Sequence, residues 1–311
     1  MKNLDYFENA FENVNPKIID GQIKPHKMCM LLAMLDLANS GGLKRNEIYF
    51  EPPLLERYLS YFFNTKSKND APNPHYPFVY LTGKLKNGAP SFWHLKKIDE
   101  NIAIQGRKEN RYIKENIEFA YLDEDLFRLI QHPKNIETLE NVLSRFWFDR
   151  TNEDLKSIIE NNNQISRYEN QIRLGRTAKL KQNPSEFIRS PAFRKVITEI
   201  YDYRCAATGS RVILPSGEAL VEAAHIHPFY VAGDDDPRNG LALTPNMHWA
   251  MDKNIISPGP DKKWHVSKSI DPRIPDLQIF TSLEGLPLIL PKESAYEPKI
   301  ESLEWRLSKL R

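Results

Sequence analysis

Four polar side chains within residues 222–252 have the types and spacing of a hydrolytic site that uses a metal ion. His225 ends an apolar run, Asn239 follows a loop rich in Gly, Asp and Pro, and His248 and Asp252 lie four residues apart. Hydrolysis of a phosphodiester requires a water molecule to lose a proton beside a negatively charged phosphate, and it requires stabilisation of the charge that builds on the phosphate oxygens. One imidazole and one divalent cation can meet both needs.

The elements that must position these side chains are two short strands and a helix. Residues 221–226 predict a strand that ends at His225, whose imidazole exchanges protons near neutral pH and suits a general base. The run 241–243 predicts the second strand, and the next segment predicts a helix. Residues four apart share one helix face, so His248 and Asp252 are predicted metal ligands.

Asn239 lies at the turn between the loop and the second strand. Its side-chain amide both donates and accepts hydrogen bonds, so we expect it to pin the loop and the backbone beside His225. We therefore assign His225, Asn239 and His248 as catalytic residues.

This stretch resembles the ββα-metal fold of HNH endonucleases, with His225, Asn239 and His248 as the three motif residues and Asp252 as an extra ligand on the helix. The resemblance covers residues 193–258, and the sequences YDYRCAATG and VEAAHIHPF resemble a subgroup common in modification-dependent restriction enzymes. Many members carry a metal ligand immediately before the base, where this chain has Ala224.

Because of Ala224, the resemblance implies an ion held by His248, Asp252, phosphate oxygens and water, with help from Glu222 or His227. Mg²⁺ is the expected ion, and Mn²⁺, Ni²⁺ or Zn²⁺ also suit a His and Asp site. His227 is interpreted either as a support for the site or as loop packing. The three acids at 234–236 are interpreted as caps of a solvated turn and are not assigned to the metal.

Cysteine usage and hydropathy argue against a zinc ribbon, a secreted protein and a membrane protein. The two cysteines, Cys29 and Cys205, are far apart, and Thr208 stands where a CxxC zinc pair would need its second cysteine. The first residues are charged and amphipathic rather than apolar, so we expect a cytoplasmic protein. No apolar run approaches the ~20 residues of a membrane span.

A chain of 311 residues with 41% hydrophobic content is long enough for two cores. We predict an α+β protein with a mixed, mainly helical N-terminal domain at 1–160, a basic helical connector at 161–190 and the ββα-metal nuclease domain at 191–311. The predicted N-terminal elements are helices at 4–14, 27–38, 54–63, 119–130 and 136–148, and a hairpin formed by FVYL and SFWHL.

The net charge of +2 is too small to indicate nucleic-acid binding. Its distribution is more informative, because residues 164–195 contain eight basic side chains and two acids. This segment is either a surface that contacts DNA phosphates or a solvated helix surface.

The N-terminal sequences KPHKMCMLLAMLDLANSGG, HYPFVYL and SFWHL resemble the sulfur-binding domain that precedes some HNH nucleases and recognises a phosphorothioate-modified DNA backbone. The resemblance covers residues 15–114. It implies that His26, Lys27, Tyr76 and Pro77 contact the modified backbone.

Physical reasoning agrees with these four residues. Sulfur is softer than oxygen and hydrogen-bonds less well, so a partly apolar cup accepts it at a lower desolvation cost. A lysine near a helix N-terminus, as predicted for Lys27, is unfavourable unless an anion compensates. A further arginine, Arg107 or Arg111, is expected to reach a base edge.

The expected function is therefore that of a modification-dependent restriction endonuclease that recognises phosphorothioated double-stranded DNA; whether it forms a homodimer is left open. The first alternative is the same nuclease with a domain that reads a base modification or an unmodified sequence. The second is a DNA-binding protein whose nuclease domain is inactive, for which Ala224 is the support.

Overall fold

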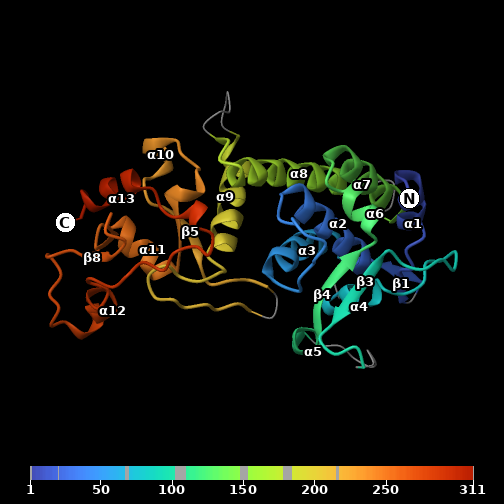
Figure 1. The fold of residues 1–311 in the computed structure, drawn as a ribbon, viewed down its shortest axis with the longest axis horizontal. Helices are drawn as coiled ribbons and strands as arrows, with labels where there is room; N and C mark the ends of the chain where they lie inside the picture. The colour runs from blue at the N-terminus through green and yellow to red at the C-terminus, as the bar shows by residue number, and fades with distance from the viewer. Residues whose placement is uncertain are drawn as a thin grey trace. The chain divides into compact units, whose positions relative to one another are not determined.

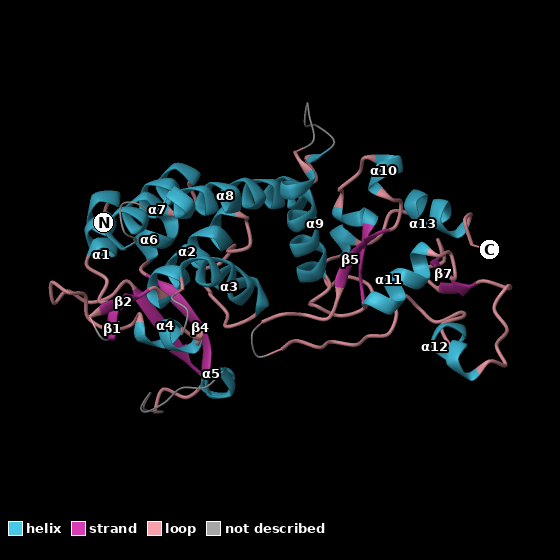
Figure 2. Ribbon diagram, turned by 180° about the vertical axis from the view of Figure 1, so that it is seen from behind, coloured by secondary structure: helices cyan, strands magenta, loops and turns pink. Residues whose placement is uncertain are grey.

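The structure, a computed structural model, describes residues 2–19, 21–66, 70–101, 110–147, 153–177, 184–214 and 217–310. The fold is α+β, with helices and short antiparallel strand pairs (Figures 1 and 2). The chain divides into an N-terminal unit, Met1–Arg167 with Pro215–Gly217, and a C-terminal unit, Tyr168–Leu214 with Glu218–Arg311. Helix α8 (Glu153–Arg173) contributes residues to both units.

Helices packed around α2 and two strand pairs make up the N-terminal unit. Besides the first part of α8, its helices are α1 (Leu4–Glu12), α2 (His26–Asn39), α3 (Pro52–Thr65), α4 (His75–Tyr80), α5 (Asn110–Asn116), α6 (Glu124–Leu129) and α7 (Pro133–Trp147). The antiparallel pairs are β1 (Lys17–Ile19) with β2 (Gln22–Lys24), and β3 (Trp93–Lys97) with β4 (Ile117–Leu122).

Helix α2 is the centre of the N-terminal core. It is apolar on all sides from Met28 to Leu35, every one of these residues is fully buried, and it packs against α3, α4 and α7. Within the described part of the chain, neither α2 nor any other helix is long and apolar enough to cross a membrane. Apart from Ala38 near its end, α2 is partly accessible in its first turn, which carries His26 and Lys27.

Two predictions for this unit are wrong. FVYL does not pair with SFWHL: residues 78–80 end helix α4, and β3 pairs with β4 in the register Trp93↔Leu122. Pro77 does not break α4, because it is the third residue of the helix, where the backbone N–H has no partner within the helix. The helix predicted at 119–130 is instead the end of β4 followed by α6.

Two strand pairs and several short helices form the C-terminal unit. The antiparallel pairs are β5 (Glu222–His225) with β6 (Gly240–Leu243), and β7 (Ile256–Pro258) with β8 (Trp264–Val266). The helices are α9 (Glu186–Ile200), α10 (Phe229–Ala232), α11 (Pro245–Asp252), α12 (Gln278–Thr281) and α13 (Ile300–Leu307), with 3-10 turns η2 (Pro237–Asn239), η3 (Pro275–Leu277) and η4 (Ser294–Tyr296). Helices α9 and α11 both pack on the β5–β6 pair (Figure 1).

A glycine allows α9 to lie close to this strand pair. Gly240 is the partner of His225 in the β5–β6 register, and a Cβ at Gly240 would lie only 2.4 Å from Cδ1 of Ile197 on α9. A larger residue would push the helix away from the end of β5, where the candidate base is held.

Three of the eight basic residues in the stretch 164–195 are paired with acids within the C-terminal unit. Arg173 pairs with Glu199, Lys195 with Glu169 and Arg189 with Asp235. These three cations therefore do not form a bare phosphate-contacting surface. Arg167, Arg176 and Arg194 are exposed, whereas Lys179 and Lys181 lie outside the described residues.

Candidate active site and ligand pocket

Strand β5 and helix α11 bring His225, His248 and Asp252 to one open cleft of ≈1210 Å³. The cleft is also lined by Glu222 and by the aromatic rings of Phe193, Phe229 and Trp305. Asn239, the fourth predicted site residue, is 1% exposed and lies behind the cleft surface.

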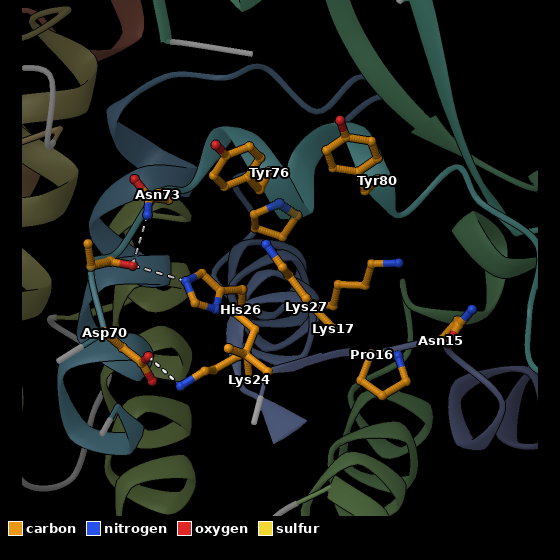
Figure 3. Close-up of a pocket in the computed structure, with 13 residues that line it drawn as sticks. Asn15, Pro16, Lys17, Lys24, His26, Lys27, Asp70, Asn73, Tyr76 and Tyr80 are labelled. Atoms are coloured by element: carbon orange, nitrogen blue, oxygen red, sulfur yellow. Dashed lines mark hydrogen bonds and ion pairs between the residues drawn. The ribbon is translucent and has the colours of Figure 1, made fainter. Parts of the chain in front are cut away.

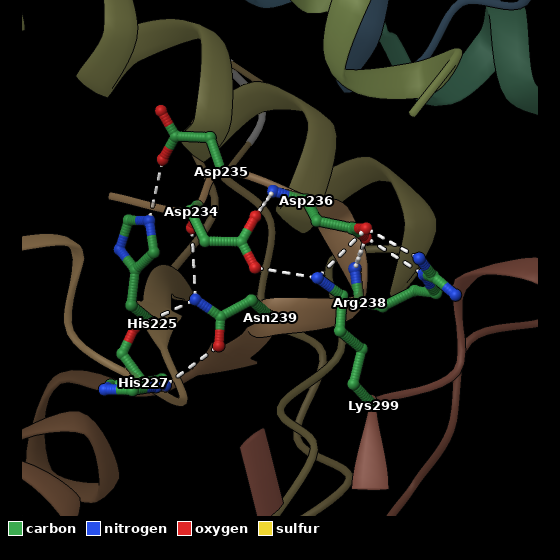
Figure 4. A network of polar contacts seen from close by, with 8 residues as sticks. All are labelled: His225, His227, Asp234, Asp235, Asp236, Arg238, Asn239 and Lys299. Carbon is green, nitrogen blue, oxygen red and sulfur yellow. Dashed lines mark hydrogen bonds and ion pairs between the residues drawn. The ribbon is translucent and has the colours of Figure 1, made fainter. Parts of the chain in front are cut away.

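Asn239 makes the backbone contacts that its position predicts (Figure 4). Its Oδ1 accepts from the N–H of His227 at 2.9 Å, and its Nδ2 donates to the carbonyl oxygens of His227 at 2.8 Å and Asp234 at 3.1 Å. These three bonds tie the acidic loop to the backbone that leaves β5 just after His225. Their geometry suits an orienting residue, and its catalytic role stays a prediction.

His225 is held by a buried carboxylate that the sequence did not indicate. Its Nε2 lies 2.8 Å from Oδ1 of Asp235, whose side chain is fully buried (Figure 4). The same carboxylate accepts hydrogen bonds from the hydroxyl of Tyr168 at 2.9 Å and from Nη1 of Arg189 at 3.0 Å. The interpretation of the acidic run as a solvated turn is thus wrong for Asp235.

The two flanking acids do have the turn-capping role. Oδ1 of Asp234 accepts from the N–H of Asp236 at 2.9 Å, and Oδ1 of Asp236 accepts from the N–H of Arg238 at the start of η2. Lys299 binds both carboxylates, at 2.7 and 3.1 Å (Figure 4). The loop therefore points its middle acid inward and its outer acids toward cations.

Aromatic rings fix the plane of the His225 imidazole. The ring of Phe193 stacks on it with a centroid separation of 3.8 Å and an interplanar angle of 6°, and Phe229 lies at 6.0 Å. Among the described residues Nδ1 of His225 has no hydrogen-bond partner, and the side chain lines the cleft.

Arg306 holds the backbone at the end of β5, and its burial lowers the pKa of its guanidinium. It comes from α13 and donates to the carbonyl oxygens of Ile226 at 2.6 Å, His225 at 3.2 Å and Met251 at 3.4 Å. Residue 306 is 81 positions from His225, so no local pattern indicated this contact.

His227 packs rather than faces a ligand. Strand β5 ends at His225, so the face shared by His225 and His227 does not continue. The His227 ring stacks on Trp305 at 4.0 Å with an interplanar angle of 18°, and burial lowers its pKa. Of the two interpretations of His227, the geometry favours loop packing.

The two predicted metal ligands face each other on α11, with Nε2 of His248 3.5 Å from Oδ2 of Asp252. The other nitrogen, Nδ1, lies 3.0 Å from Oε2 of Glu222. A neutral imidazole has one N–H, so it can donate to only one of the two carboxylates. If Nδ1 donates to Glu222, Nε2 of His248 and the Asp252 carboxylate would be the residues that hold a divalent cation.

This donor set fits a divalent ion for which the protein supplies only some of the ligands. Across the described residues, no three His, Cys, Asp or Glu side chains form a complete metal-binding group. One imidazole and one carboxylate leave the remaining coordination positions to phosphate oxygens and water.

A second cavity, in the N-terminal unit, has a volume of ≈650 Å³ (Figure 3). Its walls come from the β1–β2 hairpin, the first turn of α2, the loop before α4, and α4 itself. The structure brings together here the four residues predicted to contact the DNA backbone, His26, Lys27, Tyr76 and Pro77.

His26 supports the wall of this pocket. Its Nε2 is 3.0 Å from the carbonyl oxygen of Ala71, and burial lowers its pKa. A carbonyl can only accept, so Nε2 donates, and a neutral ring then has no N–H left for a phosphate. A neighbouring ion pair, Lys24 with Asp70 at 2.7 Å, anchors the same loop.

Lys27 has no ion-pair partner among the described residues, and the same holds for Lys17, whose amino group lies over the ring of Tyr76. Burial lowers the pKa of Lys27. Its amino group points toward the helix that carries Tyr76 and Tyr80, whose rings stack at 6.2 Å (Figure 3). A partly buried ammonium without a carboxylate is costly, and an anionic ligand would compensate it.

Of the two predicted base-reading arginines, the described one, Arg111, does not line this pocket. The side chain of Arg111 is 87% exposed, is bonded to Glu115 on α5 at 2.7 Å, and does not line the cavity. Arg107 lies outside the described residues.

Comparison with known proteins identifies one part of the chain. Residues 205–257 match the HNH endonuclease family, so the C-terminal unit contains an HNH endonuclease domain, a class of domain that uses a divalent metal ion. A solved structure named "Modification dependent TagI restriction endonuclease" is similar at 22% identity and a TM-score of 0.32, over 42% of this chain and 40% of that one. No curated protein matches the chain.

Proposed function

We propose that this protein is a modification-dependent restriction endonuclease, in which the N-terminal unit recognises phosphorothioated double-stranded DNA and the HNH domain hydrolyses phosphodiester bonds. One observation carries the nuclease part of this proposal. The cleft of the HNH domain contains an imidazole oriented through Nε2, His225, and a separate imidazole–carboxylate pair, His248 and Asp252.

In the proposed reaction Nδ1 of His225 takes a proton from a water molecule. The water oxygen then forms a bond to phosphorus as the bond from phosphorus to the leaving sugar oxygen breaks. A divalent ion held by His248 and Asp252 would supply charge stabilisation at the phosphate oxygens and the leaving oxygen. Asn239 and Arg306 keep the end of β5 in position throughout.

The recognition part of the proposal is supported by the composition of the N-terminal pocket. Tyr76 and Pro77 offer an apolar wall, and the proline contributes no backbone N–H to that wall. Lys27 lies beside them with a positive charge that a DNA phosphate can neutralise. Such a pocket tolerates a soft sulfur better than an oxygen, which loses more hydrogen bonds on entering.

Both alternatives remain testable. A domain that reads bases would need groove contacts, and Arg111 is engaged with Glu115 on the surface. The inactive-nuclease alternative depends on Ala224, which is fully buried, whereas the neighbouring Ala223 lines the cleft. A ligand missing at position 224 therefore removes no donor from the cleft surface.

The test is a cleavage assay on two duplexes of one sequence, phosphorothioated and plain, with Mg²⁺, Mn²⁺, Ni²⁺ or Zn²⁺. The proposal expects metal-dependent cleavage of the modified duplex only. Equal cleavage of both duplexes would support a different reader, and binding without cleavage under every metal would support the inactive nuclease.

A further inference from the structure

We propose that Asp235 is a positioning residue that fixes the tautomer of His225 and leaves Nδ1 as the proton acceptor. This inference depends on the proposed nuclease function, because it concerns the same imidazole. It extends that function by assigning a role to a carboxylate in the loop of the ββα motif, and to a phenol and a guanidinium that lie outside the motif.

The first step is the burial of the Asp235 carboxylate. Its side chain is fully buried, and three elements supply its partners: β5 through His225, α8 through Tyr168 and α9 through Arg189. A buried carboxylate is stable only when it is paired and hydrogen-bonded. Arg189 supplies the charge and Tyr168 supplies a neutral donor, since burial raises the pKa of the Tyr168 hydroxyl and keeps it protonated.

The second step is the direction of the hydrogen bond to His225. A carboxylate accepts hydrogen bonds and does not donate them, so the 2.8 Å contact requires Nε2 of His225 to carry the proton. A neutral imidazole protonated at Nε2 has its lone pair at Nδ1. The partner of one ring nitrogen thus decides which nitrogen can act as a base.

The third step is that aromatic contacts hold the imidazole in the plane of this bond. Phe193 covers one face of the ring at 3.8 Å, and Arg189 is itself fixed over the ring of Phe229, 3.6 Å from its centroid. Arg189 therefore contacts both the carboxylate and an aromatic ring beside the base. The arrangement is more than a chance surface pair, because His225 and Arg189 each have a second contact that holds them.

The informative variant is Asp235→Asn, which keeps the size of the side chain. An asparagine can turn its amide toward Nε2 and donate to it, which would move the proton to Nδ1 and abolish the acceptor. We expect the turnover rate to fall by about 10²–10⁴-fold, while the DNA affinity stays unchanged. Asp236→Asn is the matched control, since Asp236 contacts Arg238 and Lys299 rather than the base.

The direct readout is the tautomer of His225, measured by nitrogen NMR on the ¹⁵N-histidine-labelled full chain, with His225→Ala to assign the signal. The parent and Asp236→Asn should show protonated Nε2, and Asp235→Asn should show protonated Nδ1. Tyr168→Phe, which removes one donor but not the carboxylate, should keep protonated Nε2 and lose less activity.

These outcomes separate the positioning role from the nuclease function. A parent protein that cleaves no DNA would contradict the nuclease function, while its NMR signal would still report the tautomer. If the parent cleaves and Asp235→Asn retains both its rate and protonated Nε2, the positioning role is overturned. It is also overturned if Asp235→Asn loses activity only together with its thermal unfolding transition, while Tyr168→Phe behaves as the parent does.

Discussion

The two candidate sites differ in whether the side chains assigned to function are paired with carboxylates. In the HNH cleft both histidines lie against carboxylates, His225 against Asp235 and His248 against Glu222 and Asp252. In the N-terminal pocket Lys27 is partly buried and, within the described part of the chain, has no carboxylate partner.

This difference is what we expect if the cleft catalyses the reaction and the pocket binds DNA. Groups that must react are oriented by the protein before DNA arrives, which lowers the reorganisation needed in the reaction. A group that must bind is left for the ligand to neutralise, so its energy appears as affinity. Variants of the cleft should therefore change the rate, and variants of the pocket should change affinity.

The largest expected effect comes from His225→Ala. Removing the general base should reduce cleavage by about 10²–10⁴-fold and leave DNA binding intact, because the N-terminal pocket is untouched. Single-turnover cleavage and a binding isotherm on the same duplex measure the two quantities. A fall in DNA affinity as large as the fall in rate would contradict the separation of binding from catalysis. Cleavage within a few-fold of the parent rate would contradict the assignment of His225 as the base.

The next effect concerns the metal. Loss of an outer hydrogen-bond partner such as Glu222 should raise the metal concentration needed for half-maximal cleavage by about 10–100-fold. His248→Ala should raise this concentration further, because it removes a metal ligand. Asp252→Ala should raise it less, since its side chain is more exposed and phosphate or water can replace one oxygen. Metal titrations of both variants and of Glu222→Gln test this order. An unchanged midpoint for both would remove His248 and Asp252 from the metal site.

The sequence predicted the cleft better than its surroundings, for a physical reason. His225 ends β5, Asn239 lies directly before β6, and His248 and Asp252 share one face of α11, so their spacing limits their geometry. Asp235 lies in a loop, where no periodicity tells which of three adjacent acids points inward. Arg306 acts through tertiary packing from a distant helix.

The N-terminal unit was harder to predict because its pocket is assembled from separated segments. The first turn of α2 was predicted correctly, as its apolar run is long. Helix α4 has only six residues, and a run that short cannot be told from a strand by periodicity, which is why FVYL was assigned to a hairpin. That the pocket reads phosphorothioate stays a prediction.

The third prediction tests whether the pocket distinguishes sulfur from oxygen. Tyr76→Ala should weaken binding to phosphorothioated duplex by about 1–3 kcal/mol and change binding to plain duplex little, since it removes an apolar wall rather than a charge. Phe63→Ala is the control, as Phe63 is an exposed aromatic residue of the same unit outside the pocket. Equal losses on both duplexes would show that Tyr76 contributes to DNA binding without recognising sulfur.

The smallest effect, Lys27→Ala, tests the unpaired charge itself. Binding to both duplexes should weaken together. The slope of log affinity against log salt concentration should fall in magnitude by about 0.9, the value for one phosphate contact. Lys96→Ala is the control, since Lys96 pairs with Glu100 away from the pocket.

Affinity measured across alkaline pH provides the second readout. Burial lowers the pKa of Lys27, and a bound phosphate favours the ammonium form and raises that pKa again. The phosphate contact is therefore complete below the pKa of the free protein and is lost as pH rises through the pKa of the complex. Lys27→Ala should abolish this alkaline loss, and a variant with the parent's pH and salt dependence would show that another cation binds the phosphate.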